Sequence, residues 1–268
     1  MNTMYKAMTI AGSDTSGGAG MEADLKTFQE MGVYGMTALT CIVAQNPHKE
    51  WAHEIYPIAL DVIEKQISTI CDGIGSDAMK TGMLGSADLV ELVARTIDKY
   101  QLKNVVIDPV MVCKGIETIM VPEAAAAIKE VLVKRADVIT PNTIEAAYLS
   151  GMPKVTTLEE MQEAAGRIKE LGAKYVIMKA GERFPGSQAL DLIYDGKTFT
   201  INKHPKLTGC FNQGAGCTFS AGITACLAKG LSVQEALTAT EKFIAAALHG
   251  SFRLNKYSGA TRHCAWRA

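Results

Sequence analysis

The residues with the clearest chemical potential lie in one short stretch, Asn212-Gln213-Gly214-Ala215-Gly216-Cys217-Thr218. A Gly-Ala-Gly turn that leads directly into a helix leaves backbone N–H groups pointing outward without partners. Together with the positive end of the helix dipole, these groups form a site for an anion such as a phosphate. Cys217 lies inside the turn, and the field that holds an anion also lowers the pKa of a thiol. The stretch therefore predicts a phosphate site with an activated base, although a plain turn and helix cap would use the same residues.

The composition limits what kind of protein this is. A chain of 268 residues with 48% hydrophobic residues can bury a full core. The net charge of −1 argues against nucleic acid or an anionic membrane as the main partner. Seven scattered cysteines without a Cys-x-x-Cys pair indicate reduced thiols rather than a disulfide framework or structural metal. With no apparent signal segment and no apolar run long enough for a membrane span, we expect a cytoplasmic location.

Apolar runs alternate with helical periodicity along the chain. We expect strands at 5–11, 36–44, 77–82, 104–112, 137–140 and 174–179, and a hairpin with an Asp-Gly turn at 190–197. We expect helices at 21–31, 60–71, 87–100, 122–133, 143–149, 158–171, 218–229 and 233–248. This alternation predicts an α/β fold with a mostly parallel sheet covered by helices on both faces. No linker or repeat divides the chain, so residues 1–268 are predicted to form a single domain.

Polar residues follow most of the predicted strands. They include Asp14 after the first strand, Gln45 after the second, Lys80 to Met83, Asp108 to Gly115, Thr140 to Asn142, and Lys179 to Gly181. In open α/β sheets ligands bind beyond the carboxyl ends of the strands. This edge of the sheet is therefore the predicted active site, independently of any family.

These motifs resemble the ribokinase-like vitamin kinases, in the branch of hydroxymethylpyrimidine (phosphate) kinases and similar bacterial pyridoxal kinases. The resemblance rests on Gly12-Ser13-Asp14 with Gly17-Gly18-Ala19-Gly20 and Ala23-Asp24-Leu25-Lys26-Thr27, Lys80-Thr81-Gly82-Met83, Asp108-Pro109-Val110-Met111, Thr140-Pro141-Asn142 with Glu145, and Gly214-Ala215-Gly216-Cys217-Thr218. It covers nearly the whole chain in order. It implies a ribokinase-like fold, an ATP- and Mg²⁺-dependent kinase of a ring-borne hydroxymethyl group, and usually a homodimer.

The resemblance also implies roles for residues around the transferred phosphoryl group. Cys217 corresponds to the base that accepts the hydroxyl proton, and backbone N–H groups of Gly214, Ala215 and Gly216 would hold the phosphoryl group. Lys179 corresponds to the family's phosphate lysine, with Gly181 beside it on the ATP side. A lysine at a strand end can equally be a solvated charge.

Two acidic residues and one asparagine complete the ATP side by the same resemblance. Asp108 and Glu145 match the acidic pair near Mg²⁺, which keeps much of its hydration, so part of the contact is expected through water. Asn142 matches the asparagine on the nucleotide side. It can also cap the following helix, and both roles are compatible.

Cys113, in Val112-Cys113-Lys114-Gly115, bears on the choice of substrate. A thiolate adds to an aldehyde, and capture of pyridoxal as a hemithioacetal would free the hydroxymethyl oxygen that its aldehyde otherwise occupies. Hydroxymethylpyrimidine has no aldehyde and needs no second thiol. Cys113 therefore favours pyridoxal, although it could be an incidental thiol in a loop.

The remaining site residues face the substrate by resemblance. They are Gly12, Asp14, Ala19, Val43, Gln45, Met83 and Val110. Core packing is an alternative for the apolar ones. Gln45 resembles the ring-binding glutamine of the pyrimidine kinases. Gln213 stands where close relatives commonly carry histidine, and because glutamine cannot titrate, a proton relay at that position is in doubt.

Three hypotheses follow. The first is a pyridoxal kinase, acting also on pyridoxine and pyridoxamine in vitamin B6 salvage. The second is a hydroxymethylpyrimidine kinase of thiamine synthesis, supported by Gln45 and opposed by Cys113. The third is a catalytically idle nucleotide- or vitamin-binding protein, against which the acidic, lysine and cysteine positions count.

Overall fold

The computed structural model describes residues 4–112, 118–181 and 184–267. Within them, nine strands form one sheet in the order β3-β2-β1-β4-β5-β6-β7-β8-β9. The sheet strands are β1 (Lys6–Asp14), β2 (Tyr34–Asn46), β3 (Ala52–Pro57), β4 (Ala78–Thr81), β5 (Val105–Ile107), β6 (Val138–Ile139), β7 (Tyr175–Ala180), β8 (Gln188–Tyr194) and β9 (Phe199–Pro205). The pairs from β2 through β7 are parallel, whereas β3, β8 and β9 pair antiparallel at the edges.

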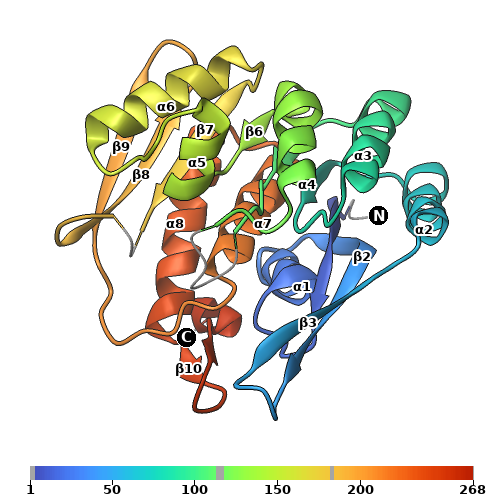
Figure 1. Ribbon diagram of the computed structural model, residues 1–268, viewed down its shortest axis with the longest axis horizontal. Coiled ribbons are helices and arrows are strands. Elements are labelled where there is room, and N and C mark those ends of the chain that lie inside the picture. Colours follow the sequence, from blue (N-terminus) through green and yellow to red (C-terminus); the bar gives the residue numbers. More distant parts are fainter. Residues whose placement is uncertain (1–3, 113–117, 182–183, 268) are drawn as a thin grey trace.

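Helices cover both faces of this sheet (Figure 1). The α-helices are α1 (Gly20–Glu30), α2 (Leu60–Gly73), α3 (Ala87–Tyr100), α4 (Pro122–Ala127), α5 (Thr143–Ser150), α6 (Leu158–Glu170), α7 (Ala215–Ala228) and α8 (Val233–His249). Neighbouring strand residues face opposite sides: Val106 packs with α7 and α8, whereas Val105 and Ile107 pack with the helices of the other face. The predicted mostly parallel α/β sheet with helices on both faces is confirmed.

Three local differences from the predicted elements have physical explanations. Strand β5 ends at Ile107 rather than Val112, because Pro109 lacks the N–H group that would continue the ladder. Helix α4 ends at Ala127, and the chain continues in a wider π turn, η1 (Ile128–Leu132), and a short 3₁₀ turn, η2 (Val133–Arg135). Strand β3 was not expected, because this edge strand is largely exposed and carries no buried apolar run.

The difference that matters most for the site is at α7. This helix begins at Ala215, three residues before the predicted start, and Gly214 is its N-cap. Gly214 has a left-handed φ of 81°, and a Cβ there would collide with the carbonyl oxygen of Gly18. Cys217 therefore lies in the first turn of the helix rather than in the loop before it.

The C-terminal segment, in which no helix or strand was predicted, folds back over this turn. It contains β10 (Phe252–Arg253), β11 (Gly259–Ala260) and a 3₁₀ turn, η3 (His263–Arg267). Gln213 and Ala260 form a parallel bridge, and the Thr218 hydroxyl lies 2.9 Å from His263 Nε2. The segment thus holds both ends of the Gln213–Thr218 turn.

Candidate active site

The predicted phosphate turn and the predicted phosphate lysine lie close together. Lys179 stands near the carboxyl end of β7, and its Nζ is 4.0 Å from where a Cβ on Gly216 would be. The N-terminal N–H groups of a helix have no intrahelical acceptors, and the dipole adds positive potential there. A lysine, a glycine turn and a helix start thus combine into a site suited to an anion.

Asp108 connects the lysine to helix α7. Its Oδ1 accepts from Lys179 Nζ at 3.2 Å and from the Thr140 hydroxyl at 3.3 Å. Its Oδ2 accepts from the Ser220 hydroxyl at 2.9 Å. Asp108 is only 4% exposed, so this carboxylate is held between three elements with little freedom to move.

Glu145 lies beside Asp108 in the first turn of α5. Its side chain accepts from the backbone N–H of Asn142 at 2.9 Å and of Met111 at 3.3 Å, while Asn142 caps the same helix with its own side chain. Burial raises the pKa of Glu145 to about 7; Lys179 lowers it and the Asp108 carboxylate raises it further. The two close, buried carboxylates can carry more negative charge than the one neighbouring lysine neutralises. Their oxygen donors fit a hard cation such as Mg²⁺.

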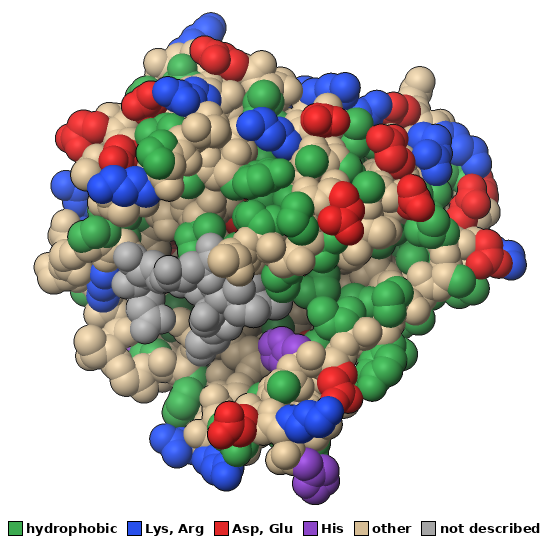
Figure 2. All heavy atoms as spheres, in the orientation of Figure 1, with side chains coloured by type: hydrophobic (Ala, Val, Ile, Leu, Met, Phe, Trp, Pro, Cys, Tyr) green, Lys and Arg blue, Asp and Glu red, His purple; other side chains and the backbone are tan. Residues whose placement is uncertain are grey.

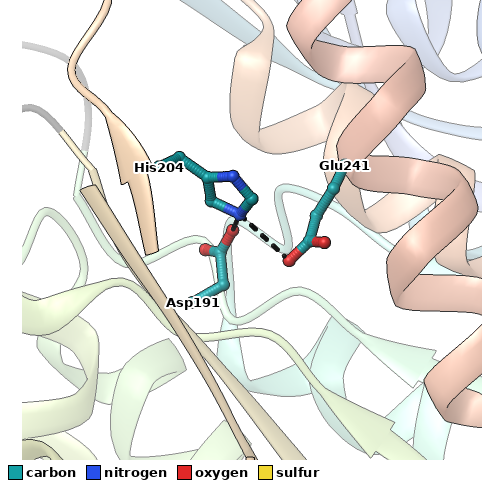
Figure 3. A group of neighbouring side chains, drawn as sticks. All are labelled: Asp191, His204 and Glu241. Atoms are coloured by element: carbon teal, nitrogen blue, oxygen red, sulfur yellow. Dashed lines mark ion pairs between the residues drawn. The ribbon is translucent and has the colours of Figure 1, made fainter. Parts of the chain in front are cut away.

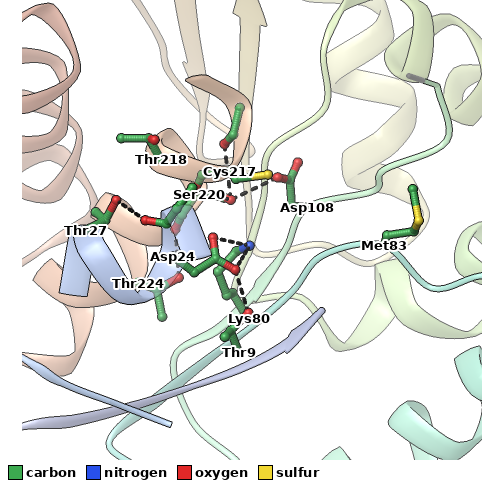
Figure 4. A network of polar contacts seen from close by, with 12 residues as sticks. Thr9, Asp24, Thr27, Lys80, Met83, Asp108, Cys217, Thr218, Ser220 and Thr224 are labelled. Carbon is green, nitrogen blue, oxygen red and sulfur yellow. Dashed lines mark hydrogen bonds and ion pairs between the residues drawn. The ribbon is translucent and has the colours of Figure 1, made fainter. Parts of the chain in front are cut away.

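Cys217 lies between Asp108 and a second, deeper ion pair (Figure 4). In that pair, Lys80 Nζ contacts both carboxylate oxygens of Asp24 at 2.9 and 3.0 Å, and both side chains are fully buried. The Thr9 hydroxyl also donates to Asp24 at 2.7 Å. This network forms the floor of the site, below the sulfur.

The expectation of a lowered thiol pKa is wrong for the protein alone. Burial raises the pKa of Cys217 to about 12; the Asp24 and Asp108 carboxylates raise it further, whereas Lys80 and the Gly20 N–H lower it. The helix N-terminus is therefore outweighed by desolvation and two nearby carboxylates. The position of the sulfur at the helix start agrees with the prediction, but its ionisation does not.

Asp14 organises the loops around the turn instead of standing free. Its oxygens accept from Gln45 Nε2 at 2.7 Å, Gln213 Nε2 at 2.9 Å and Ala19 N at 2.8 Å, and Ser16 donates through both its N–H and its hydroxyl. Although burial acts to raise the pKa of Asp14, these hydrogen bonds from Ser16, Gln45 and Gln213 bring it below its ordinary value. Gln213, where a proton relay was in doubt, is thus a donor that joins β1 to α7.

The remaining substrate-side residues surround these polar groups. Gly12 and Val43 lie on β1 and β2, where the Cβ of a larger residue at 12 would meet Cys41 Sγ at 2.6 Å. Met83 and Val110 follow β4 and β5 and line a largely apolar cavity of about 370 Å³ that extends under α2, α3 and α4. The structure therefore brings them to the same end of the sheet as Cys217, as the strand-end argument required.

Two predicted residues add little here. Gly181 follows β7 and is exposed, with no heavy atom within 4 Å of a Cβ built on it. Cys113 lies outside the described residues, so its proposed reaction with an aldehyde stays a prediction.

The roles of Asp24, Lys80 and Ser220 were not predicted from the sequence. Asp24 and Lys80 occur in motifs that carried the resemblance, yet charged residues in apolar runs gave no indication of their pairing across 56 positions. A lysine inside a predicted buried strand was the available signal, because an unpaired buried charge is too costly to retain. Ser220 gave no such signal, since a serine in a helix of small residues is common.

The fold and these contacts describe a phosphotransferase site of the ribokinase-like type, and comparison with known proteins agrees. Residues 14–262 match the phosphomethylpyrimidine kinase family, and the chain belongs to that family. A pyridoxine kinase of Bacillus subtilis is 54% identical over 99% of this chain and 98% of its own. The crystal structure of an ADP complex of B. subtilis pyridoxal kinase superimposes with a TM-score of 0.96, at 54% identity and 99% coverage of both chains. A hydroxymethylpyrimidine/phosphomethylpyrimidine kinase of the same organism is 40% identical over 99% of this chain and 97% of its own.

Proposed function

We propose that this protein transfers the γ-phosphoryl group of ATP to the 5′-hydroxymethyl group of pyridoxal, and also of pyridoxine and pyridoxamine, in vitamin B6 salvage. The observation that carries the proposal is the meeting of Cys217, Lys179 and Asp108 at the start of α7. The higher identity to the B. subtilis pyridoxine kinase than to the pyrimidine kinase of that organism supports the choice of substrate.

The chain's own groups divide the work of phosphoryl transfer. The N–H groups at the start of α7 and the Lys179 ammonium would neutralise the charge on the transferring phosphoryl group. Asp108 orients Lys179 through its 3.2 Å contact and is itself fixed by Ser220. Gly214 brings the turn against Gly18. The Ala215 N–H, which was expected to hold the phosphoryl group, donates to the Asn212 carbonyl at 3.1 Å and would have to exchange this contact for one with the phosphoryl group.

Cys217 is proposed to accept the proton of the substrate hydroxyl. Because the thiol pKa is about 12 in the protein alone, very little thiolate exists at neutral pH before ligands bind. Neutralising the Asp108 carboxylate removes one of the causes that raise this pKa and leaves Lys80 as a nearby positive charge. The base would therefore become active only in the loaded site, which limits wasteful reaction of the thiol.

We further propose that Asp108 and Glu145 hold Mg²⁺ with the nucleotide. The fit rests on their oxygen donors and on their proximity, since burial raises the pKa of Glu145 to about 7 and the Asp108 carboxylate raises it further. A bound Mg²⁺ supplies charge neutralisation for the phosphates. The capping contacts of Glu145 with Asn142 keep that carboxylate in place between β6 and α5.

A homodimer is proposed from the exposed apolar surface of the β3 edge. Ile55 and Tyr56 on β3 are 47% and 54% exposed, and Ile42, Leu60 and Val62 beside them are also exposed. Figure 2 shows hydrophobic side chains gathered on that side of the molecule. Tyr56 stands opposite Ile42 on the paired strand, whereas Ile55 faces the other side of the sheet. Exposed apolar side chains at a sheet edge are typical of an interface. Sedimentation at micromolar concentration should give a mass of twice 28.7 kDa, and Tyr56→Lys should shift it toward 28.7 kDa.

The site of action is proposed to be the cytoplasm. The six cysteines within the described residues are all free thiols, as expected in a reducing compartment. None of the helices in that part of the chain is long and apolar enough to cross a membrane.

The activity is tested by measuring phosphorylation of each substrate separately and comparing the rates. Purified protein with ATP and Mg²⁺ is offered pyridoxal, pyridoxine or hydroxymethylpyrimidine, and the phosphorylated products are quantified by mass spectrometry. We expect a higher kcat/KM for pyridoxal. A clear preference for hydroxymethylpyrimidine would instead support the thiamine-synthesis alternative that Gln45 favours, and turnover of none would indicate a binding protein.

A matched pair of variants tests the role proposed for Cys113. Cys113→Ala should slow pyridoxal much more than pyridoxine, because only pyridoxal carries an aldehyde. Cys264→Ala, which removes an exposed thiol, is the control and should change neither rate. Equal loss on both substrates with Cys113→Ala would count against hemithioacetal capture.

A further inference from the structure

A second group of ionisable side chains lies where the β8–β9 hairpin meets α8. Asp191 comes from β8, His204 from β9 and Glu241 from α8, so three separate elements contribute one side chain each (Figure 3). The phosphotransfer site described above uses none of the three. Their convergence therefore needs its own explanation.

The distances between the three side chains suit a metal ion. His204 Nε2 lies 3.3 Å from Glu241 Oε1 and 3.8 Å from Asp191 Oδ2, and one donor atom from each residue lies within 4.8 Å of the other two. Tetrahedral Zn²⁺ bound to imidazole and carboxylate at about 2.0–2.2 Å holds its donor atoms roughly 3.3–3.6 Å apart. Small side-chain movements would bring the three donors to that spacing.

A second observation concerns the imidazole nitrogen that points into the group. Although the His204 ring is 41% exposed, its Nε2 atom is buried and makes no hydrogen bond in the described residues, despite its proximity to two carboxylates. Nitrogen atoms buried without a partner are rare and costly in folded proteins. A cation placed between the three side chains would bind Nε2 directly, in place of the two longer contacts that it makes with the carboxylates.

The carboxylates also have the character of metal ligands. The side chains of Asp191 and Glu241 are only 19% and 12% exposed, so both carboxylates are largely shielded from water. Two carboxylates in this position repel each other unless a positive charge lies between them. Asn202 Nδ2 donates to Glu241 Oε1 at 2.7 Å, which is the kind of outer contact that orients a ligating carboxylate.

We propose that Asp191, His204 and Glu241 bind one divalent transition metal ion, for which Zn²⁺ matches the donor set and spacing best, and that the ion fastens the β8–β9 hairpin to α8. One imidazole nitrogen and two carboxylate oxygens leave a fourth position for water. This site is separate from Asp108 and Glu145, so it does not depend on the proposed kinase activity. It would stabilise the strand pair that borders β7, where Lys179 pairs in register with Asp191.

Metal binding can be measured directly on the full chain without nucleotide. Co²⁺ is titrated into wild-type protein and followed by its visible absorption, and Zn²⁺ is then added to displace it. We expect one ion per chain with N/O coordination and no intense thiolate charge-transfer band, since none of the cysteines in the described residues belongs to this group. His204→Ala should weaken Zn²⁺ binding at least 100-fold, and Zn²⁺ should raise the unfolding midpoint of wild type but not of this variant.

Two further variants separate loss of a ligand from loss of folding. Glu241→Gln removes a ligand with little change in shape, and circular dichroism confirms that the chain is folded before titration. Asn202→Ala should weaken binding about 10- to 100-fold, because the Asn202 amide orients Glu241 without binding the ion itself. His53→Ala, at an exposed histidine on β3, is the control and should bind as wild type does. Unchanged Zn²⁺ stoichiometry and affinity in His204→Ala and Glu241→Gln would overturn the proposal, as would absence of binding to wild type.

Discussion

The thiol of Cys217 should be protonated and slow to react in the protein without ligands. Its pKa of about 12 lies well above the ordinary 9.0, because burial and the Asp24 and Asp108 carboxylates disfavour the thiolate. At pH 8 this shift lowers the thiolate fraction about 1000-fold relative to an unperturbed cysteine. A more basic thiolate is also a better nucleophile, which recovers roughly 16- to 32-fold of the rate. The net expectation is a reaction about 30- to 60-fold slower than that of an ordinary thiol.

The assay is modification by an aromatic disulfide between pH 7 and 11, with each cysteine quantified by peptide mass spectrometry. The rate at Cys217 should rise about tenfold per pH unit over this whole range, since pH 11 is still below the thiol pKa. Restricted access to the sulfur would lower all rates equally but would not produce this slope. Cys264, an exposed thiol, provides the internal reference. A rate that levels off near pH 7 would refute the reasoning, because it would mean that the helix N-terminus keeps the sulfur ionised.

Three further perturbations test other parts of the site. Gly214 has a φ of 81° and lies against the Gly18 carbonyl, so Gly214→Ala should displace the turn and lower kcat/KM about 100-fold. Wild-type activity in this variant would contradict the need for glycine. Lys80→Met leaves Asp24 buried without its partner and should cost about 3–5 kcal/mol in urea unfolding, while the double variant Asp24→Leu/Lys80→Met should recover much of this loss. Burial, and to a lesser extent Lys26, lowers the pKa of His263 to about 4, so the unfolded chain binds a proton below pH 6.5 that the native chain does not. Stability should therefore fall by on the order of 3 kcal/mol as the pH drops from about 6.5 to 4, and His263→Gln should lose this part of the pH dependence when unfolding is followed across that range.

Much of the fold could be predicted from the sequence because the periodicities are strong. The helix at Ala87–Tyr100 has the predicted bounds, since Ser86 caps it and a continuous apolar stripe is buried. The predicted hairpin with an Asp-Gly turn is present as β8 and β9, with Gly196 at φ 99°. By contrast, β3 is a short exposed strand paired with the preceding β2, and such strands carry too little pattern to be identified in advance. The C-terminal segment is held by contacts with Gln213 and Thr218, which are distant in the sequence.

The candidate site divides in a similar way. The carboxyl-end rule for parallel sheets correctly brought Asp108 and Lys179 together, because topology alone fixes where strand ends lie. The Gly214–Cys217 turn follows the antiparallel strand β9 and was predicted instead from its glycines and the helix start. The ionisation of Cys217 could not be predicted in this way. It depends on Asp24 and Asp108, which are 193 and 109 positions away (217 − 24 and 217 − 108), and on how deeply the sulfur is buried. Local sequence gives the helix dipole but not the opposing charges.

The central claim is that Cys217, at the start of α7, accepts the proton when the phosphoryl group is transferred. The most direct test compares wild type and Cys217→Ala in steady-state phosphorylation of pyridoxal by ATP with Mg²⁺, with ATP affinity measured separately. Loss of a general base should lower kcat about 10²- to 10⁴-fold, with ATP affinity nearly unchanged. A Cys217→Ala variant whose kcat stays within a few-fold of wild type would contradict the account.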